Sequence, residues 1–117
     1  MNKKLLKFFR EYNKIHWNNQ LPEINLILTS TFEPDTVGEY ISPDSEEKDV
    51  YENYCIKIAK GLNTLETKLT LLHEMVHHSQ FTKNKQKYFK KKLKWHGTFW
   101  RQEMRRVGFK GKINQYT

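Results

Sequence analysis

The segment LLHEMVHHSQF, residues 71–81, limits what this chain can fold into more than any other feature. It places three histidines and a glutamate in a largely apolar run. His73 and His77 are four residues apart, so on a helix they project from one face, one turn apart. At that spacing two imidazole nitrogens reach the same tetrahedral zinc ion, at about 2.0–2.1 Å each. The segment therefore predicts a helix that carries two ligands of a metal site.

Glu74 directly follows the first histidine and completes the pattern H-E-x-x-H, here HEMVH. Its carboxylate is expected to point aside from the metal, yet close enough to reach a water that the metal holds. Zinc lowers the pKa of such a water and polarises a substrate carbonyl. Glu74 is then expected to act as general base and to deliver the proton to the leaving amine. The alternative is a pair of histidines on a solvated helix face.

A catalytic zinc ion needs a third protein ligand and an open position for water. We favour His96 in WHGTFW, because the chain can fold back after the 18 residues that separate it from His77. Glu103 is the alternative, since a carboxylate is also an acceptable ligand. His78 points about 100° away from its neighbour around the helix, and we expect it on the surface or behind a ligand. His16 is expected to be a surface or packing residue.

The remaining elements follow from apolar spacing and from turn residues. Residues 3–18 have helical spacing, Asn2 can cap their start, and NNQLPE is expected to end the helix because Pro22 disfavours it. The apolar face of this helix consists of Leu5, Phe8, Phe9, Tyr12 and Ile15. Three β-rich runs then occupy residues 24–29, 37–42 and 54–59.

A second helix is predicted over residues 64–81. Asn63 and Glu66 form a capping-box pattern at its start. Its expected apolar stripe consists of Leu65, Leu69, Leu72 and Val76. A lysine-rich connection follows, and a last helix runs up to Gly108. The order helix, three strands, helix, loop, helix predicts a small α+β fold.

Length and composition indicate one folded domain, residues 1–117, with 37% hydrophobic and 14% aromatic residues. No apolar run is long enough to span a membrane. The N-terminus has no apolar signal core, so we expect a cytoplasmic protein. Cys55 is the only cysteine, which excludes an internal disulfide and a cysteine-rich zinc ribbon. We expect it to be a small buried hydrophobe.

Charge is distributed unevenly along the chain. Residues 1–82 hold 9 Lys or Arg against 12 Asp or Glu, whereas residues 83–117 hold 12 Lys or Arg against Glu103 alone. Such a split indicates either a polyanion partner, such as DNA, or a solvated basic tail. The expected polyanion-binding face consists of Lys83, Lys85, Lys87, Lys90, Lys91, Lys92 and Lys94. Trp95, Trp100 and Tyr88 are available to stack on unpaired bases.

Several motifs together resemble those of the SprT-like metalloproteases, the zincin group that includes Spartan. They are YNKIHWNNQLPEINLIL, the glycine in TVGEYI, IKIAKGL, TLLHEMVHHSQF and WHGTFWRQEMRRVGF, in the family's order over nearly the whole chain. The resemblance implies a minimal zincin-like domain with an N-terminal helix, a small three-stranded sheet, an active-site helix and a C-terminal helix. The chain resembles the bare catalytic core, without the zinc ribbon that many members carry.

The resemblance also implies a function and site residues. His73, His77 and His96 would be the Zn²⁺ ligands, Glu74 the catalytic base, and the activity zinc-dependent proteolysis, often of DNA-bound proteins. A peptide substrate is expected to add to an exposed strand edge, for which VGEYIS is the candidate. The alternative function is a nucleic-acid-binding module with a structural or vestigial zinc site.

Overall fold

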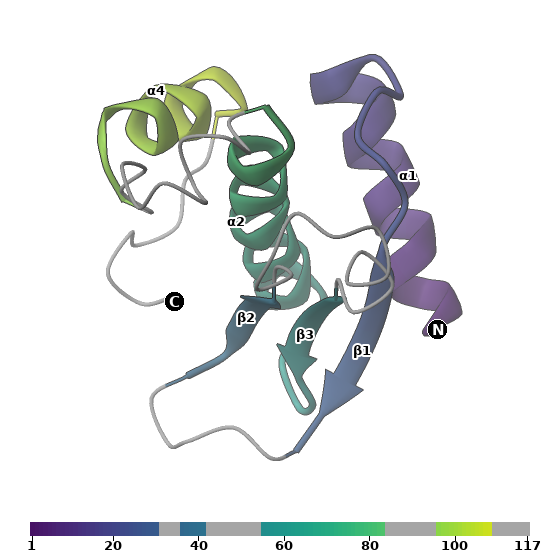
Figure 1. The fold of residues 1–117 in the computed structure, drawn as a ribbon. Coiled ribbons are helices and arrows are strands. Elements are labelled where there is room, and N and C mark those ends of the chain that lie inside the picture. Colours follow the sequence, from purple (N-terminus) through teal and green to yellow (C-terminus); the bar gives the residue numbers. More distant parts are fainter. Residues whose placement is uncertain (31–35, 42–54, 84–95, 109–117) are drawn as a thin grey trace.

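The structure, a computed structural model, describes residues 1–30, 36–41, 55–83 and 96–108. In chain order, the elements are α1 (Lys3–Trp17), β1 (Asn25–Thr29), β2 (Gly38–Ile41), β3 (Cys55–Ala59), α2 (Thr64–Lys83) and α4 (Thr98–Arg106). Figure 1 shows α2 standing between α1 and α4, with the strands across the lower part of the molecule. The predicted α+β fold is confirmed, with three helices and a small mixed sheet in the described residues.

The sheet has the strand order β1-β3-β2. The central strand β3 runs parallel to β1 and antiparallel to β2, so that Ile56 pairs with Leu26 on one side and with Tyr40 on the other. Within the described residues, β2 therefore has a strand neighbour on one side only. The expectation of an edge strand at VGEYIS agrees with this arrangement.

Helix α1 begins as predicted, because the Asn2 side chain accepts a hydrogen bond from the Leu5 amide at 3.0 Å. It ends at Asn18, whose left-handed φ of 51° reverses the chain, four residues before Pro22. The predicted face is wrong at Ile15, which is 70% exposed. Asn13 is buried instead, and its side-chain amide bonds both the amide and the carbonyl of Leu21, at 3.0 and 2.9 Å.

Helix α2 has two different halves. Its start follows the local signals, since Asn63 and Glu66 exchange the two hydrogen bonds of a capping box at 3.0 and 2.8 Å. The predicted apolar stripe is wrong at Leu65, which is 66% exposed. From Thr70 to Phe81 every residue is buried, so this half of the helix has no solvent-exposed face, although it contains polar residues. A helix buried all round must be packed against other elements on every side. Here α1, α4 and the sheet surround α2.

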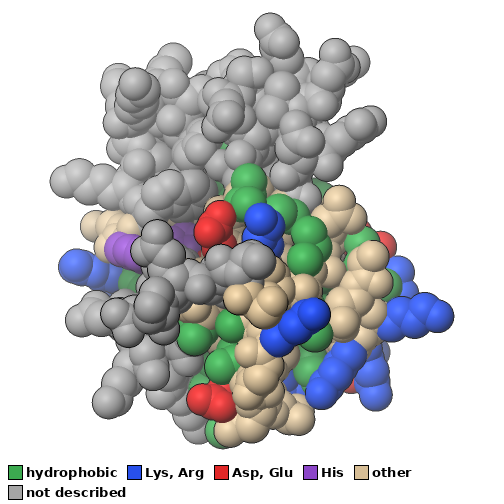
Figure 2. Space-filling view, turned by 90° about the horizontal axis from the view of Figure 1, so that it is seen from below, with side chains coloured by type: hydrophobic (Ala, Val, Ile, Leu, Met, Phe, Trp, Pro, Cys, Tyr) green, Lys and Arg blue, Asp and Glu red, His purple; other side chains and the backbone are tan. Residues whose placement is uncertain are grey.

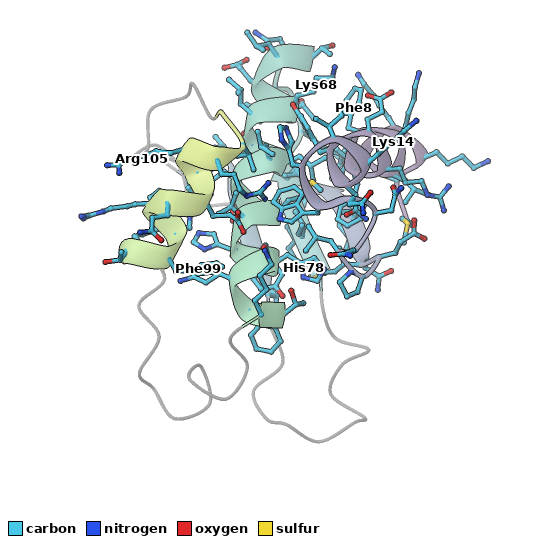
Figure 3. All side chains as sticks on the ribbon, turned by 90° about the horizontal axis from the view of Figure 1, so that it is seen from above. Phe8, Lys14, Lys68, His78, Phe99 and Arg105 are labelled. Atoms are coloured by element: carbon cyan, nitrogen blue, oxygen red, sulfur yellow. The ribbon has the colours of Figure 1, made fainter. Side chains whose placement is uncertain are left out.

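The core lies where these elements meet. Phe9 of α1, Leu26 and Ile56 of the sheet, and Met75 of α2 are all fully buried in it. Figure 3, viewed from above, shows side chains filling the space between α2 and both neighbouring helices, with Phe8 on the α1 side. Cys55 is buried, as expected. No helix in the described residues is long and apolar enough to cross a membrane.

Candidate metal centre

The buried half of α2 carries the first two histidines. His73 and His77 are 0% and 4% exposed, and their ring centroids lie 5.0 Å apart. The helical repeat places them on one face, as the sequence predicts. The packing around α2 holds that face away from water, which local sequence did not reveal.

The third histidine comes from the turn before α4. The Nε2 atom of His96 lies 3.2 Å from the Nε2 atom of His77. Each of the three histidines offers one ring nitrogen, and these atoms all lie within 4.8 Å of one another. His96 is more exposed than the other two. The fold therefore brings together three imidazoles that the sequence separates by up to 23 positions.

The donor set fits a small divalent metal ion. Two nitrogens at about 2.0–2.1 Å from one tetrahedral zinc are separated by roughly 3.3 Å, close to the observed 3.2 Å. Burial, followed by the neighbouring His73 and His96, lowers the pKa of His77 to about 3. Burial also lowers the pKa of His96. Both imidazoles are therefore neutral at pH 7, as metal ligands must be.

Trp100 of α4 covers the histidines from one side. Its ring centroid lies 5.4 Å from that of His73, 6.0 Å from that of His77 and 4.6 Å from that of His96. Because its side chain is 1% exposed, the prediction that Trp100 stacks on nucleic-acid bases is wrong. It packs against the three imidazoles instead and restricts their orientations.

Glu74 is buried beside the edge strand. Its side chain is 0% exposed, and neither carboxylate oxygen has a hydrogen-bond partner among the residues that the structure describes. A Cβ atom built on Gly38 of β2 would lie 2.5 Å from Thr70 Cγ2 and 3.0 Å from the Glu74 Oε2 atom, so a side chain at this position would force these neighbours to shift. Burial, followed by the negative charge of Glu39, raises the pKa of Glu74 well above its usual value. A cation nearby would lower that pKa again.

Glu103, the alternative third ligand, has other partners. Ser79 donates to its Oε2 atom at 2.8 Å, and the Lys83 amine lies 3.3 Å from the same atom. Arg106 contacts its Oε1 atom. The cluster of metal-ligand atoms contains His96 and not Glu103.

His78 is buried, with 1% of its side chain exposed. Of the two expectations for this residue, the position on the surface is therefore wrong. The Pro22 carbonyl can only accept, so the Nε2–H group donates to it at 2.8 Å. The Nδ1 atom then accepts from the Tyr40 hydroxyl at 3.0 Å. Burial lowers the pKa of His78 to about 4. His78 thus ties strand β2 to α2, while His16 packs between Tyr12 and Trp17, as expected.

The sequence analysis assigned no role in the site to two residues of VGEYIS, although it named Gly38 among the family motifs. Gly38 admits the Glu74 carboxylate, and Tyr40 reaches the histidine next to His77. Their positions in VGEYIS, at the predicted strand edge, were the available signal. Their contacts with α2 depend on how the sheet packs against the helix.

The expected polyanion-binding face lies almost entirely outside the described residues. Only Lys83 is described, as the exposed last residue of α2. Lys85, Lys87, Lys90, Lys91, Lys92 and Lys94 lie in the undescribed segment, as do Trp95 and Tyr88. Helix α1, by contrast, carries five exposed cations against Glu11: Lys3, Lys4, Lys7, Arg10 and Lys14.

A small mixed sheet, a buried helix with HEMVH and a third histidine before the last helix together define a minimal zincin-like fold. The model of the SprT-like family matches residues 5–117. The chain therefore belongs to the SprT-like family, as its motifs indicated. Comparisons with curated proteins and with solved structures gave no significant match. Family membership and the histidine cluster together support a metal-binding domain of the metalloprotease type.

Proposed function

We propose that the chain is a zinc-dependent endopeptidase. One observation carries this proposal: three imidazole nitrogens lie within 4.8 Å of one another, and a fully buried carboxylate follows the first of these histidines in the helix. Three histidines leave one tetrahedral position open, which a catalytic zinc site requires and a closed structural site lacks.

His73, His77 and His96 would hold the metal ion. Zinc in such a site supplies a Lewis acid that polarises a carbonyl and lowers the pKa of water. Glu74 would accept a proton from the attacking water and later donate it to the leaving amine. A carboxylate without a protein partner is available for both transfers, and its raised pKa makes it a stronger base.

Strand β2 is the proposed binding edge for a protein or peptide substrate. Its second side has no strand neighbour within the described residues, so an extended peptide can add there through main-chain hydrogen bonds. Gly38 lies against the Glu74 carboxylate, which brings the base close to this strand. The Tyr40 hydroxyl bonds His78 and fixes the strand relative to the histidines of α2.

The experiment is proteolysis by the zinc-loaded protein of a dye-labelled, unfolded protein substrate, with and without single-stranded DNA. Glu74→Gln should keep the zinc and lose about 10³-fold in activity, the typical contribution of a general base. Leu65→Ala is a matched control on the same helix, since Leu65 is exposed and distant from the packed half. Unchanged activity of Glu74→Gln would contradict the proposed mechanism.

A second candidate function is a nucleic-acid-binding module whose zinc is structural or vestigial. The five exposed cations of α1 favour this function, together with the lysines that follow Lys83 in the sequence. Figure 2 shows most of the Lys and Arg side chains in view on the right, the side of α1 in Figure 1, and histidines on the left. Both functions would combine in a protease acting on DNA-bound proteins.

Salt dependence separates the two candidates. Phosphate contacts release counterions, so the logarithm of DNA affinity falls linearly with that of the salt concentration. Neutralising Lys85, Lys87, Lys90 and Lys91 should flatten this slope if the lysine-rich segment binds DNA. DNA binding that persists at moderate salt, with no cleavage of any protein substrate, would favour the binding module. An unchanged slope would mean that the segment is a solvated loop.

A further inference from the structure

A chain of hydrogen bonds crosses the three helices on the α4 side of α2. The indole Nε1–H of Trp17 in α1 donates to the Ser79 hydroxyl in α2 at 3.1 Å. The same hydroxyl donates to the Oε2 atom of Glu103 in α4 at 2.8 Å. All three side chains are buried, so each bond replaces one that water would otherwise supply.

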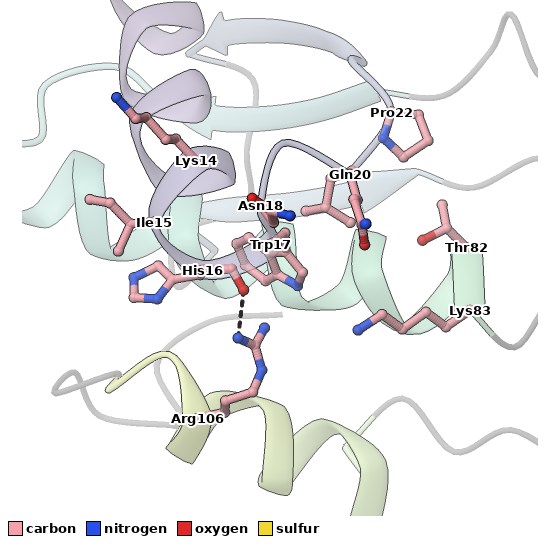
Figure 4. A pocket seen from close by; sticks show the side chains of 11 residues that line it. Lys14, Ile15, His16, Trp17, Asn18, Gln20, Pro22, Thr82, Lys83 and Arg106 are labelled. Atoms are coloured by element: carbon pink, nitrogen blue, oxygen red, sulfur yellow. Dashed lines mark hydrogen bonds between the residues drawn. The ribbon is translucent and has the colours of Figure 1, made fainter.

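Arg106 connects this hydrogen-bond network back to α1. Its Nε atom contacts the second oxygen of Glu103, and its Nη1 atom donates to the His16 carbonyl at 2.5 Å. Figure 4 shows the Arg106 guanidinium beneath Trp17, with Lys83 directed to the same region. The Arg106 guanidinium carbon lies 5.5 Å from the Trp17 ring centroid. The network thus returns from α4 to the end of α1. Ser79 bonds directly to both other helices, whereas Glu103 bonds α2 through Ser79 and holds Arg106 of its own helix, which reaches α1.

Helix α4 depends on contacts of this kind. It has nine residues, and its N-cap, Gly97, provides no side-chain cap. Isolated helices shorter than about 12–15 residues are marginal in water, so packing must hold it. His96 directly precedes Gly97, and Trp100 lies in the first turn, so the placement of α4 sets where both meet His73 and His77.

We propose that Glu103 is a positioning residue for the metal centre: its bond to Ser79 docks α4 against α2, its contact with Arg106 orients the guanidinium that reaches the end of α1, and together they place His96 and Trp100. The inference rests on the proposed metal site. It gives Glu103 a different role from the ligand role that its sequence position allowed, because both of its oxygens are engaged with Ser79, Lys83 and Arg106. Partners on both oxygens hold the carboxylate in one orientation, and Glu103 lies outside the cluster of potential metal-ligand atoms.

The test is the Zn²⁺ affinity of the full chain, measured by competition with a chromophoric chelator. Glu103→Gln should raise the dissociation constant about tenfold, the lower end of the effect of residues behind metal ligands. The visible spectrum of the Co²⁺-loaded variant should differ from that of wild type, because displacement of His96 changes the ligand geometry. A loss of stability alone would not alter the spectrum of the folded protein.

Three further variants make the result specific. Ser79→Ala cuts the link between α2 and α4 without changing charge, and should also weaken Zn²⁺ binding. Its effect and that of Glu103→Gln should be less than additive, since both act on one network. Glu23→Gln removes the carboxylate of an exposed ion pair with Arg10 and should leave both readouts unchanged.

The outcomes are distinct. Wild-type affinity and spectrum in folded Glu103→Gln would overturn the inference. Complete loss of metal in Glu103→Gln with normal binding by Ser79→Ala would also overturn it and would make Glu103 a ligand. If Glu103→Gln does not fold, Ser79→Ala decides: weakened binding supports the positioning role, and unchanged binding contradicts it. A wild type that binds no Zn²⁺ would overturn the proposed function itself.

Discussion

Two buried carboxylates, one on α2 and one packed against it, lie in different environments. Glu74 lies against the edge strand, is 0% exposed and has no hydrogen-bond partner in the described part of the chain. Burial and the charge of Glu39 raise its pKa. Glu103 reaches α2 from α4 and is 6% exposed. Burial alone would raise its pKa, but bonds from Arg106 and Ser79 and the charge of Lys83 lower it.

The contrast agrees with the two proposed roles, a general base for Glu74 and a positioning residue for Glu103. A buried charge without partners is costly, so a fold retains it only where the group has another use. A buried charge with three partners contributes to the placement of its neighbours and has little capacity left for chemistry. Burial and residue type, which these two glutamates share, would not distinguish them; their partners do.

After the loss of about 10³-fold expected for Glu74→Gln, the next largest effect comes from filling the space beside its carboxylate. In Gly38→Ala the new Cβ atom would lie 2.5 Å from Thr70 Cγ2 and 3.0 Å from Glu74 Oε2. Displacement of the carboxylate should reduce proteolysis about 10²-fold, and overpacking should lower the free energy of unfolding by about 1–3 kcal/mol. Proteolysis assays and urea unfolding measure the two effects.

Gly61→Ala is the matched control. Gly61 has a φ of 89°, and its Cβ would meet nothing within 4 Å. This variant should lose about 1 kcal/mol through backbone strain alone and keep its activity. Full activity in Gly38→Ala would show that Glu74 does not depend on this close approach.

The next effect concerns the stability of the metal-free protein, where the two carboxylates should respond with opposite signs. Glu74→Gln removes an unpartnered buried acid and should raise the free energy of unfolding at pH 7 by about 1 kcal/mol. Glu103→Gln weakens satisfied charged hydrogen bonds and should lower it by about 1 kcal/mol. Urea unfolding in the presence of a chelator gives both values. A shift of the same sign in both variants would contradict the proposed difference between the two carboxylates.

The smallest effect is the pH dependence of those differences. Since the folded state lowers the pKa of Glu103, its contribution is present above the usual value of 4.5 and is lost as pH falls through the folded pKa. Lys83 and Arg106 are about half exposed, so the loss should be less than about 1 kcal/mol. The stability difference between wild type and Glu103→Gln should therefore shrink on acidification.

For Glu74 the sign is reversed. Its folded-state pKa is raised, so the penalty is absent below 4.5 and grows as pH rises towards the folded pKa. The advantage of Glu74→Gln over wild type should disappear in acid. An advantage that is constant from pH 7 to pH 4 would show that the carboxyl titrates normally. Comparing each variant with wild type cancels the histidines, which titrate in the same range.

Local signals were sufficient for the framework of the fold. The Asn2 cap, the Asn63–Glu66 capping box and the β-rich runs predicted where the elements lie, because each depends on residues adjacent in sequence. The H-E-x-x-H spacing placed His73 and His77 on one face for the same reason. It left His96 and Glu103 as alternatives, since their distances from that face depend on where α4 docks.

The errors have one physical origin. Leu65 and Ile15 were assigned to apolar faces by spacing, yet both are exposed, because no other described element covers that part of their helices. Trp100 was expected to be accessible to bases, and the surface was one of two expectations for His78, yet both side chains are buried where α2 meets the sheet and α4. Tertiary contacts decide burial at such positions, and these contacts cannot be predicted from the local pattern of a single sequence.

The central claim is that three histidines from α2 and the turn before α4 hold one metal ion. Elemental analysis of the purified protein tests it most directly, on wild type, His96→Ala and Glu74→Gln. One zinc ion per chain is expected in wild type and in Glu74→Gln, with marked loss in His96→Ala. No zinc in the wild type after reconstitution, or full retention in His96→Ala, would contradict it.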